Sequence, residues 1–242
     1  MPNNHFQFKQ FTIIQHKCAM KVCTDACLFG ALVAVSLPVG YQQDVVHCLD
    51  IGTGTGLLSL MFAQKNTGVF IDAIEIDKAA SEQAKENFAA SPWAEKLNIF
   101  NSDIRSFWSE KKYTCVFSNP PFFEDDLRSP EDTKNNAKHD TSLSFKELLR
   151  ATDTHLEKGG LFTVLLPFHR INYFIDEAVK FGLHVHRQIL VKQTPGHEHF
   201  RGILFLKREK NQPVFSEIII KNDEGNYTTG FITALKDYYL YL

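Results

Sequence analysis

A glycine-rich turn that follows directly on a short apolar run constrains the fold more than any other part of the chain. Residues 45–50 form a largely apolar run that ends in an acid, as expected for a strand buried on both faces. Residues 56–64 have helical spacing, and the turn between strand and helix contains Gly52, Gly54 and Gly56. A strand, a tight turn and a helix indicate an α/β domain, and the glycines allow a ligand to approach the backbone closely.

The same alternation of strands and helices continues along most of the chain. Further strands are expected at residues 70–75, 97–101, 113–118, 161–166, 183–191 and 203–207, and further helices at 78–90, 144–155 and 172–181. Gly159-Gly160 is expected to end the helix that begins at Ser144. The last two strands are joined by a loop alone and should be antiparallel. We therefore predict an α/β fold with a seven-stranded, mostly parallel sheet, one antiparallel strand and helices on both faces.

Two stretches fall outside this alternation. In residues 1–44, Phe6, Phe8 and Phe11 indicate short strands, so we predict an N-terminal extension over 1–44 and a main domain over 45–242. Residues 123–141 form a long, charged, proline-containing segment. Loops of that length in compact domains are usually functional or disordered, and this one follows the strand where an active site is expected.

Composition limits the class of protein without naming a partner. Lys and Arg number 26 and Asp and Glu 28, so the net charge of 26 − 28 = −2 neither indicates nor excludes a nucleic-acid partner. The five cysteines match no zinc-binding spacing, and we expect reduced thiols in a cytoplasmic protein without a bound metal. No signal peptide is recognisable and no apolar run approaches the roughly 18 residues of a membrane span, so we expect no membrane partner. We expect a monomer or a weak oligomer.

Acids at the ends of three successive predicted strands complement the glycine turn. Asp50 lies two residues before Gly52, where a carboxylate would repel a pyrophosphate and suit a cationic ligand. S-adenosylmethionine carries an ammonium and a sulfonium group and meets that requirement. Glu75 ends the second strand, as expected for an acceptor of ribose hydroxyls, and Asp103 follows the third, where it could meet the adenine amine of the cofactor. A nicotinamide cofactor, or a plain turn with solvated acids, remains an alternative.

The fourth predicted strand ends in Asn119-Pro120-Pro121-Phe122, which suits transfer to an aromatic amine. The prolines fix two φ angles and remove two donors, so the segment is stiff. An aromatic amine is a poor nucleophile because its lone pair is delocalised into the ring. The Asn119 side-chain oxygen and the Pro120 carbonyl could accept its two hydrogens and stabilise positive charge on nitrogen, while Phe122 stacks on the target ring. The alternative is a Pro-Pro turn capped by core phenylalanines.

Both motifs together, Asp50-Ile51-Gly52-Thr53-Gly54-Thr55-Gly56 and Asn119-Pro120-Pro121-Phe122, resemble the Rossmann-like class I amino-methyltransferases. Those enzymes use S-adenosylmethionine to methylate adenine N6, guanine N2 or the side-chain amide of glutamine. The N-terminal segments at residues 8–13 and 18–30 narrow this resemblance to the bacterial family that methylates N6 of adenine 37 in tRNA(Val). Ala137-Lys138-His139 is similar to the Ala-Arg-His of that family, with Lys in place of Arg.

The resemblance implies an enzyme whose N-terminal extension closes over the cofactor. Lys21, Thr24 and Asp25 would then help to hold the methionine end of S-adenosylmethionine, and tRNA would be the macromolecular substrate. Alternatives are a guanine-N2 rRNA methyltransferase, a protein glutamine-N5 methyltransferase and a non-catalytic RNA-binding protein with a degenerate methyltransferase fold. Candidate RNA contacts are residues 193–201 together with Lys9, Lys17, Lys134, Lys138, Arg170, Lys192 and Arg201.

Overall fold

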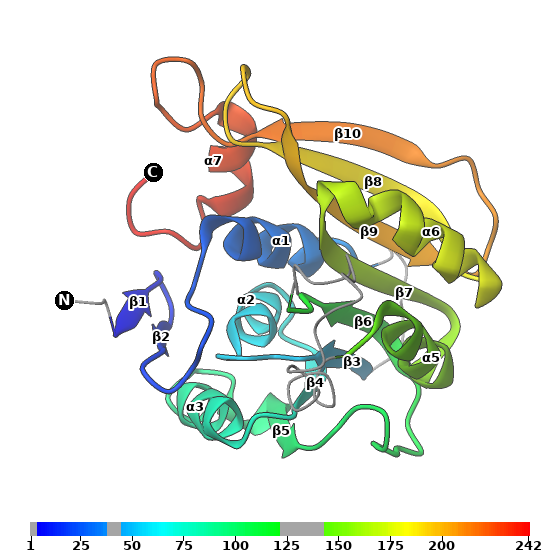
Figure 1. Ribbon diagram of the computed structural model, residues 1–242. Coiled ribbons are helices and arrows are strands. Elements are labelled where there is room, and N and C mark those ends of the chain that lie inside the picture. Colours follow the sequence, from blue (N-terminus) through cyan, green and yellow to red (C-terminus); the bar gives the residue numbers. More distant parts are fainter. Residues whose placement is uncertain (1–3, 38–44, 122–142) are drawn as a thin grey trace, which may run out of the picture.

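The computed structural model describes residues 4–37, 45–121 and 143–242 of the chain (Figure 1). Phe122, the predicted loop at 123–141 and the segment Ala137-Lys138-His139 therefore lie outside the described residues, as do Lys134 and Lys138. The strands are β1 (His5–Gln7), β2 (Thr12–Ile14), β3 (Val46–Ile51), β4 (Val69–Glu75), β5 (Leu97–Asn101), β6 (Tyr113–Ser118), β7 (Leu156–Pro167), β8 (His184–Lys192), β9 (His199–Lys207) and β10 (Val214–Ile219). The helices are α1 (Thr24–Ala34), α2 (Leu57–Lys65), α3 (Lys78–Ala89), α5 (Phe145–His155), α6 (Ile171–Lys180) and α7 (Thr229–Leu235), with short 3₁₀ turns η1 (Ala94–Lys96) and η2 (Phe168–Arg170).

The main sheet has the strand order β10-β8-β9-β7-β6-β3-β4-β5. Strand β9 is antiparallel to both of its neighbours, and all other pairs in this sheet are parallel. The predicted α/β fold, the mostly parallel sheet and its one antiparallel strand are therefore confirmed. The predicted number of strands is one short, because β10 adds an eighth strand beside β8. Four of its six residues are exposed, so its sequence carries no run of buried apolar residues that would predict a strand.

The predicted role of Gly159-Gly160 is wrong. Helix α5 ends earlier, at His155, and β7 begins at Leu156, which pairs with Tyr113. The two glycines lie inside β7, at an irregular part of its pairing with β6. Gly159 has a positive φ of 87°, and a Cβ on Gly160 would meet Leu156 at 2.7 Å. The glycines therefore let the strand kink, and they do not cap the helix.

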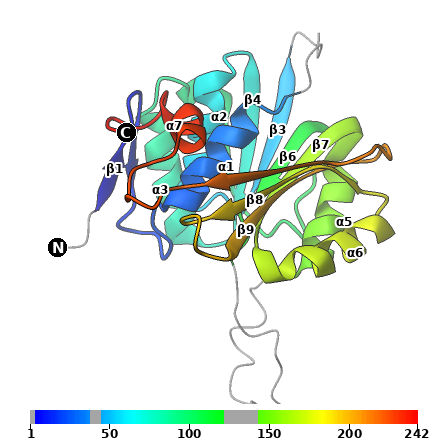
Figure 2. The same cartoon turned by 90° about the horizontal axis from the view of Figure 1, so that it is seen from above.

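Two layers of helices bury the two faces of the sheet (Figure 2). Successive strand residues alternate between the layers, so Cys48 and Phe117 pack on the side of α1, α2, α3 and α7. Leu49 and Val116 pack on the other side, with α5 and α6. Because β3 and β6 are buried on both faces, their polar residues can be accessible only near the strand ends. Among the described residues, no helix is long and apolar enough to cross a bilayer.

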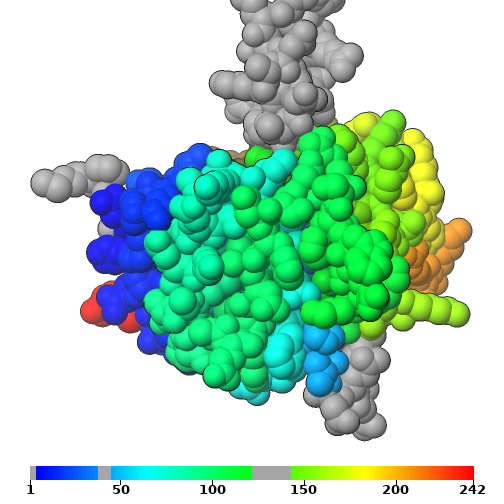
Figure 3. Space-filling model, turned by 90° about the horizontal axis from the view of Figure 1, so that it is seen from below, coloured from blue at the N-terminus to red at the C-terminus, as the bar shows by residue number. Residues whose placement is uncertain are grey.

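The predicted short strands of the N-terminal extension are present as the hairpin β1-β2, and α1 follows them. The buried residues of α1 belong to the same core as those of α2 and α7, so the part of the extension from residue 24 to 34 is continuous with the main domain. The hairpin is held to α3 by the Asn87 amide, whose Oδ1 accepts from the Ile14 amide at 2.9 Å. The same Asn87 donates to the carbonyls of Ile14 and Thr55, at 2.9 and 2.8 Å. Figure 3 shows the blue N-terminal segment against the teal part of the chain that contains α3.

The chain reverses its order across the sheet between β3 and β6. Strands β4 and β5 are added on one side of β3, whereas β6 and β7 are added on the other. In open α/β sheets, ligands bind outside the carboxyl ends of the strands at such a reversal. A ligand site is therefore expected beside the residues that follow Ile51 and Ser118.

Candidate functional site

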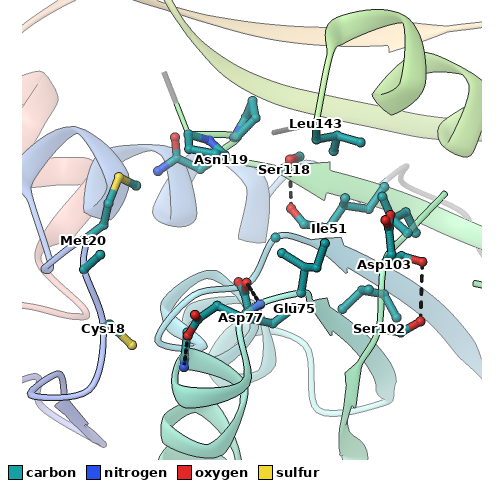
Figure 4. Close-up of a pocket in the computed structure, with 18 of the residues that line it drawn as sticks. Cys18, Met20, Ile51, Glu75, Asp77, Ser102, Asp103, Ser118, Asn119 and Leu143 are labelled. Atoms are coloured by element: carbon teal, nitrogen blue, oxygen red, sulfur yellow. Dashed lines mark hydrogen bonds between the residues drawn. The ribbon is translucent and has the colours of Figure 1, made fainter. Parts of the chain in front are cut away.

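A pocket of about 350 Å³ lies at the carboxyl ends of β3, β4, β5 and β6. Five of the predicted site residues line it together: Gly52, Glu75, Asp103, Asn119 and Pro120. In Figure 4, Glu75 and Asp77 lie below, Ser102 and Asp103 on one side, and Cys18 and Met20 from the N-terminal segment on the other. The volume is within the range of small-molecule and cofactor sites. The glycine turn and the Asn119 segment therefore share one cleft.

The glycine turn has a backbone that few other residues could adopt. Gly52, Gly54 and Gly56 have φ values of +72°, +56° and +83°. The amides of Gly52 and Thr53 both donate to the Ile74 carbonyl, at 2.9 and 3.1 Å, which ties the turn to β4. A Cβ on Gly56 would meet the Phe88 ring at 2.4 Å, whereas Gly52 and Gly54 face open space. The turn is thus packed against α3 on one side and open to a ligand on the other.

Asp50 lies behind this turn and does not line the pocket. Its side chain is fully buried, and Oδ2 accepts from the hydroxyls of Thr53 at 2.6 Å and Ser59 at 2.7 Å. Its Oδ1 is buried without a partner among the described residues. Burial raises the pKa of Asp50 to about 6, although both hydroxyls oppose that shift. The carboxylate therefore holds the turn from its buried side, and the predicted contact of Asp50 with a ligand stays a prediction.

Glu75 connects the end of β4 to the glycine turn. Its Oε2 accepts from the Gly54 amide and its Oε1 from the Asp77 amide, both at 2.9 Å. Two backbone donors therefore fix the orientation of the carboxylate at the pocket wall. Each oxygen of an ionised carboxylate has a further lone pair, so both can still accept from ligand hydroxyls.

Asp103 lies at the pocket wall after β5, and Arg105 holds its carboxylate. The guanidinium donates to Oδ2 from Nε at 2.8 Å and from Nη2 at 2.6 Å. These bonds lower the pKa of Asp103 and keep it ionised. Ser102 precedes it, and the Ser102 amide donates to the Glu75 carbonyl at 3.1 Å, so β4 and β5 are joined at their ends. An ionised, fixed acceptor at this point suits an amine on a ligand.

The side-chain oxygen of Asn119 has no hydrogen-bond donor within the part of the chain that the structure describes. The Ser118 hydroxyl donates to the Ile51 carbonyl at 2.8 Å and fixes the end of β6 against β3. The next residue, Asn119, lines the pocket, and its Oδ1 is buried without a hydrogen-bond partner among the described residues. Pro120, which is buried, and Pro121 continue the lining. A buried acceptor without a donor is costly, and its position at a pocket indicates a ligand that supplies the donor.

The N-terminal side of the pocket differs from the sequence prediction. Residues 17–20 line the pocket, whereas Lys21, Thr24 and Asp25 do not appear in its wall. Asp25 instead accepts from Arg201 Nε on β9 at 2.7 Å. Burial, helped by Glu75 and Asp77, raises the pKa of the Cys18 thiol to about 11, so it is protonated at neutral pH. Cys18 and Met20 belong to the 18–30 segment that resembles the family, but the sequence singled out neither as a site residue, since a thiol and a thioether there match no recognised cofactor-binding pattern.

The residues of the pocket fit S-adenosylmethionine in three respects. Open glycines allow close backbone approach, Glu75 and Asp103 offer fixed acceptors, and the Asn119 oxygen has no donor in the described part of the chain. The acids also favour a ligand with a positive charge over one with a pyrophosphate. Among the residues that the structure describes, no three His, Cys, Asp or Glu side chains gather as metal ligands would.

Comparison with known proteins agrees with this arrangement. A family model described as methyltransferase small domain matches residues 34–181. A protein named tRNA1(Val) (adenine(37)-N6)-methyltransferase from Dyadobacter fermentans is 42% identical over 99% of both chains. A protein of the same name from Pectobacterium carotovorum is 39% identical over 98% of this chain and 94% of its own.

Solved structures of low sequence identity share the fold. A predicted O-methyltransferase from Agrobacterium tumefaciens is 15% identical, with a TM-score of 0.62 over 88% of this chain and 95% of its own. A glycopeptide N-methyltransferase complexed with S-adenosylmethionine is 13% identical, with a TM-score of 0.55 over 77% of this chain and 94% of its own. One is named for methylation of oxygen and the other for methylation of nitrogen, so both likenesses bear on the architecture alone.

Proposed function

The chain belongs to the family of tRNA1(Val) (adenine(37)-N6)-methyltransferases, and from that premise we propose that it methylates N6 of adenine 37 in tRNA(Val) with S-adenosylmethionine. The observation that carries the proposal is that Asn119 lines the same pocket as Gly52 of the glycine turn, and that its side-chain oxygen has no donor among the residues described. An exocyclic amine has two hydrogens to donate and could supply that donor. An anticodon-loop base is already unpaired, so bringing it to Asn119 costs less than opening a duplex.

The chain's own residues prepare the amine for attack. Bound S-adenosylmethionine supplies an electrophilic methyl group. Asn119 Oδ1 and the Pro120 carbonyl accept the two amine hydrogens, which raises electron density on N6 and stabilises positive charge as the new bond forms. No general base is required before the methyl transfer, because the proton is lost from an already cationic nitrogen. Phe122 is expected to stack on the target ring, and this role stays a prediction.

The other predicted residues divide between holding the cofactor and shaping its pocket. Glu75 is proposed to accept from the ribose hydroxyls and Asp103 from the adenine amine of the cofactor. Gly52, Gly54 and Gly56 form the turn that would hold the cofactor, and Asp50 supports that turn through Thr53 and Ser59. Lys21, Thr24 and Asp25 remain candidates for the methionine end.

We further propose that the N-terminal extension covers the cofactor through residues 17–20. Two contacts support this: Asn87 joins Ile14 to the carbonyl of Thr55 in the glycine turn, and Lys17 pairs with Glu86 at 2.7 Å. Extension and turn are therefore held to the same helix, α3. All five cysteines are free thiols, which suits the reducing cytoplasm in which we expect the enzyme to act.

The alternative substrates are less favoured. The relatives described above are named for adenine 37 of tRNA1(Val), and neither guanine N2 nor a glutamine amide is named for them. A degenerate, non-catalytic fold would be expected to have lost the glycines or Asn119, and both are present.

The test of this function is methylation of defined transcripts. The purified protein is incubated with labelled S-adenosylmethionine and a tRNA(Val) transcript, and nucleosides are analysed by mass spectrometry. We expect N6-methyladenosine from this transcript and none from one in which adenine 37 is replaced by guanine. Methylation of the guanine-37 transcript at an unchanged rate would refute the assigned position, and failure to bind S-adenosylmethionine in calorimetry would refute the enzyme.

A further inference from the structure

We propose that Phe168, with His199 packed against it, forms a stacking surface for a base that flanks the target adenine. The inference rests on the proposed function and adds the place where the substrate RNA lies. It concerns residues outside the pocket: Phe168 belongs to η2 and His199 opens β9. Their ring centroids are 5.2 Å apart, and Phe168 is 40% exposed.

The strand register brings this pair to the same edge of the sheet as Asn119. Ser118 at the end of β6 is level with Val164 in β7, so the segment from Asn119 to Pro121 runs beside the last residues of β7. Phe168 follows directly after β7, and Pro167 pairs with Arg201 on β9. The carboxyl end of β7 thus places Phe168 on the side of Asn119 away from the pocket acids, which follow β4 and β5.

The cofactor pocket limits the direction from which RNA can approach. Its acids lie on the β4 and β5 side of Asn119, and a cofactor bound there would occupy that side. A base presented to Asn119 must therefore enter from the side of β7 and β9, or from the solvent beyond the carboxyl ends of the strands. Its neighbours in the RNA then pass over Phe168.

The chemistry of this surface fits a nucleobase. Exposed aromatic rings bind single-stranded nucleic acid by stacking, which is tolerant of sequence because every base has a π-face. Arg170, two residues after Phe168, lies over the rings of Phe145 at 5.2 Å and Tyr173 at 5.4 Å. A cation and a second exposed ring, Tyr173 at 47%, therefore continue the surface along the start of α6.

Net charge contributes little at Phe168 itself. Glu217 accepts from His199 at 2.6 Å and pairs with Lys192 at 3.3 Å, while Asp25 pairs with Arg201. These acids offset the cations around the pair, and Glu217 also orients the His199 ring. The contribution of Phe168 should therefore depend weakly on salt, unlike contacts to phosphates, which weaken steeply as salt rises.

The first experiment compares two exposed phenylalanines, one beyond the carboxyl ends of the strands and the other near the amino end of β10. Phe168→Ala should lower kcat/KM for tRNA about 5- to 100-fold, the range of one base-stacking contact, and by a similar factor at 50 and 200 mM salt. Phe215 is 67% exposed near the amino end of β10, so Phe215→Ala should leave kcat/KM unchanged. Phe168→Tyr should keep activity, whereas Phe168→Leu, which keeps the apolar bulk, should lose it. Equal kcat/KM for Phe168→Ala and Phe215→Ala would overturn the proposal.

The second experiment identifies the stacked base. Anticodon stem-loops are prepared with an abasic nucleotide at position 36 or 38, and each is assayed with the parent and with Phe168→Ala. If Phe168 stacks on one of these bases, removing both the base and the ring should lower kcat/KM by no more than the larger of the two single changes. If neither base touches Phe168, the two fold-losses in kcat/KM should multiply. Binding of S-adenosylmethionine and methylation by the parent protein are measured in parallel. A parent that methylates neither stem-loop nor tRNA refutes the proposed function, and fully additive losses in an active parent refute only the stacking surface.

Discussion

The turns after β3 and β6 lie side by side but are built in different ways. After β3, the Asp50 carboxylate is buried behind the glycines: its Oδ2 accepts from Thr53 and Ser59, and its Oδ1 has no partner among the described residues. After β6, two prolines stiffen a segment whose one buried polar oxygen, on Asn119, finds no donor among the described residues. In the first turn, side chains hold the backbone of the glycines in place. In the second, the stiff proline backbone fixes the position of the Asn119 side chain. Cofactor affinity should therefore depend on the first and the rate of methyl transfer on the second.

Replacing Asn119 tests this division most severely. Asn119→Ala removes the acceptor for the amine, so kcat should fall about 100- to 1,000-fold, as it does when one group that stabilises transition-state charge is lost. The Kd for S-adenosylmethionine should stay within a few-fold of the parent in calorimetry. Asn119→Asp keeps an acceptor oxygen and should lose less. A rate for Asn119→Ala within about twofold of the parent would remove the assigned role.

Replacing Glu75 should do the reverse. In Glu75→Gln one carboxylate oxygen becomes an amide NH₂, so either the Gly54 amide or the Asp77 amide loses its acceptor. The Kd for S-adenosylmethionine should rise about 10- to 100-fold, the value of one or two bonds to a charged group, with kcat at saturation nearly unchanged. Glu82→Gln, an exposed change on α3, is the matched control. A fall in kcat without a change in Kd would contradict the comparison.

Asn87 tests whether the extension and the glycine turn act together. Asn87→Ala breaks the bonds that join Ile14, α3 and the Thr55 carbonyl, so the KM for S-adenosylmethionine should rise about 10-fold while kcat changes little. Asn98→Ala removes one bond, to Asp72, near the amino end of β5 and away from the glycine turn, and serves as the control. Equal KM values for the two variants, measured beside their thermal unfolding, would reduce Asn87 to a purely stabilising residue.

Replacing Asp50 has the smallest expected effect. The pH dependence that Asp50 gives to the free energy of unfolding is opposite in sign to that of an acid whose pKa falls on folding. The pKa of Asp50 is raised from 3.8 to about 6, so between these values the folded state binds the proton more tightly than the unfolded chain does. The free energy of unfolding should therefore fall as pH rises through this window. Asp50→Asn should flatten that part of the profile and gain about 1 kcal/mol at pH 7.5, since relief of the buried charge exceeds the cost of an unpaired amide. Denaturant unfolding at pH 4.5 and 7.5 measures it, and a loss at pH 7.5 would contradict burial as the cause.

The succession of strands and helices along the chain and the identity of the main motifs could be predicted because both are local. A buried parallel strand is recognised from its own residues, and all parallel strands end at one edge of the sheet, so Gly52, Glu75 and Asn119 had to lie near one another. The same logic failed at Gly159-Gly160, where a glycine pair can cap a helix or kink a strand, and only the pairing of Leu156 with Tyr113 decides. It failed also for β10, whose exposed residues carry no strand pattern.

The sequence by itself determined the fold class, the glycine turn and the stiff Asn-Pro-Pro segment after β6, because each follows from patterns among residues that are close in the chain. Tertiary structure decided that residues 17–20 line the pocket and that Asn87 joins the extension to the glycine turn. It also paired Asp25 with Arg201, 176 residues away, outside the pocket wall. It also placed Asp50 on the buried side of the glycine turn, which it holds through Thr53 and Ser59. Such roles depend on where side chains from distant elements meet, and a contact between distant residues leaves no periodicity or spacing along the chain from which to predict it.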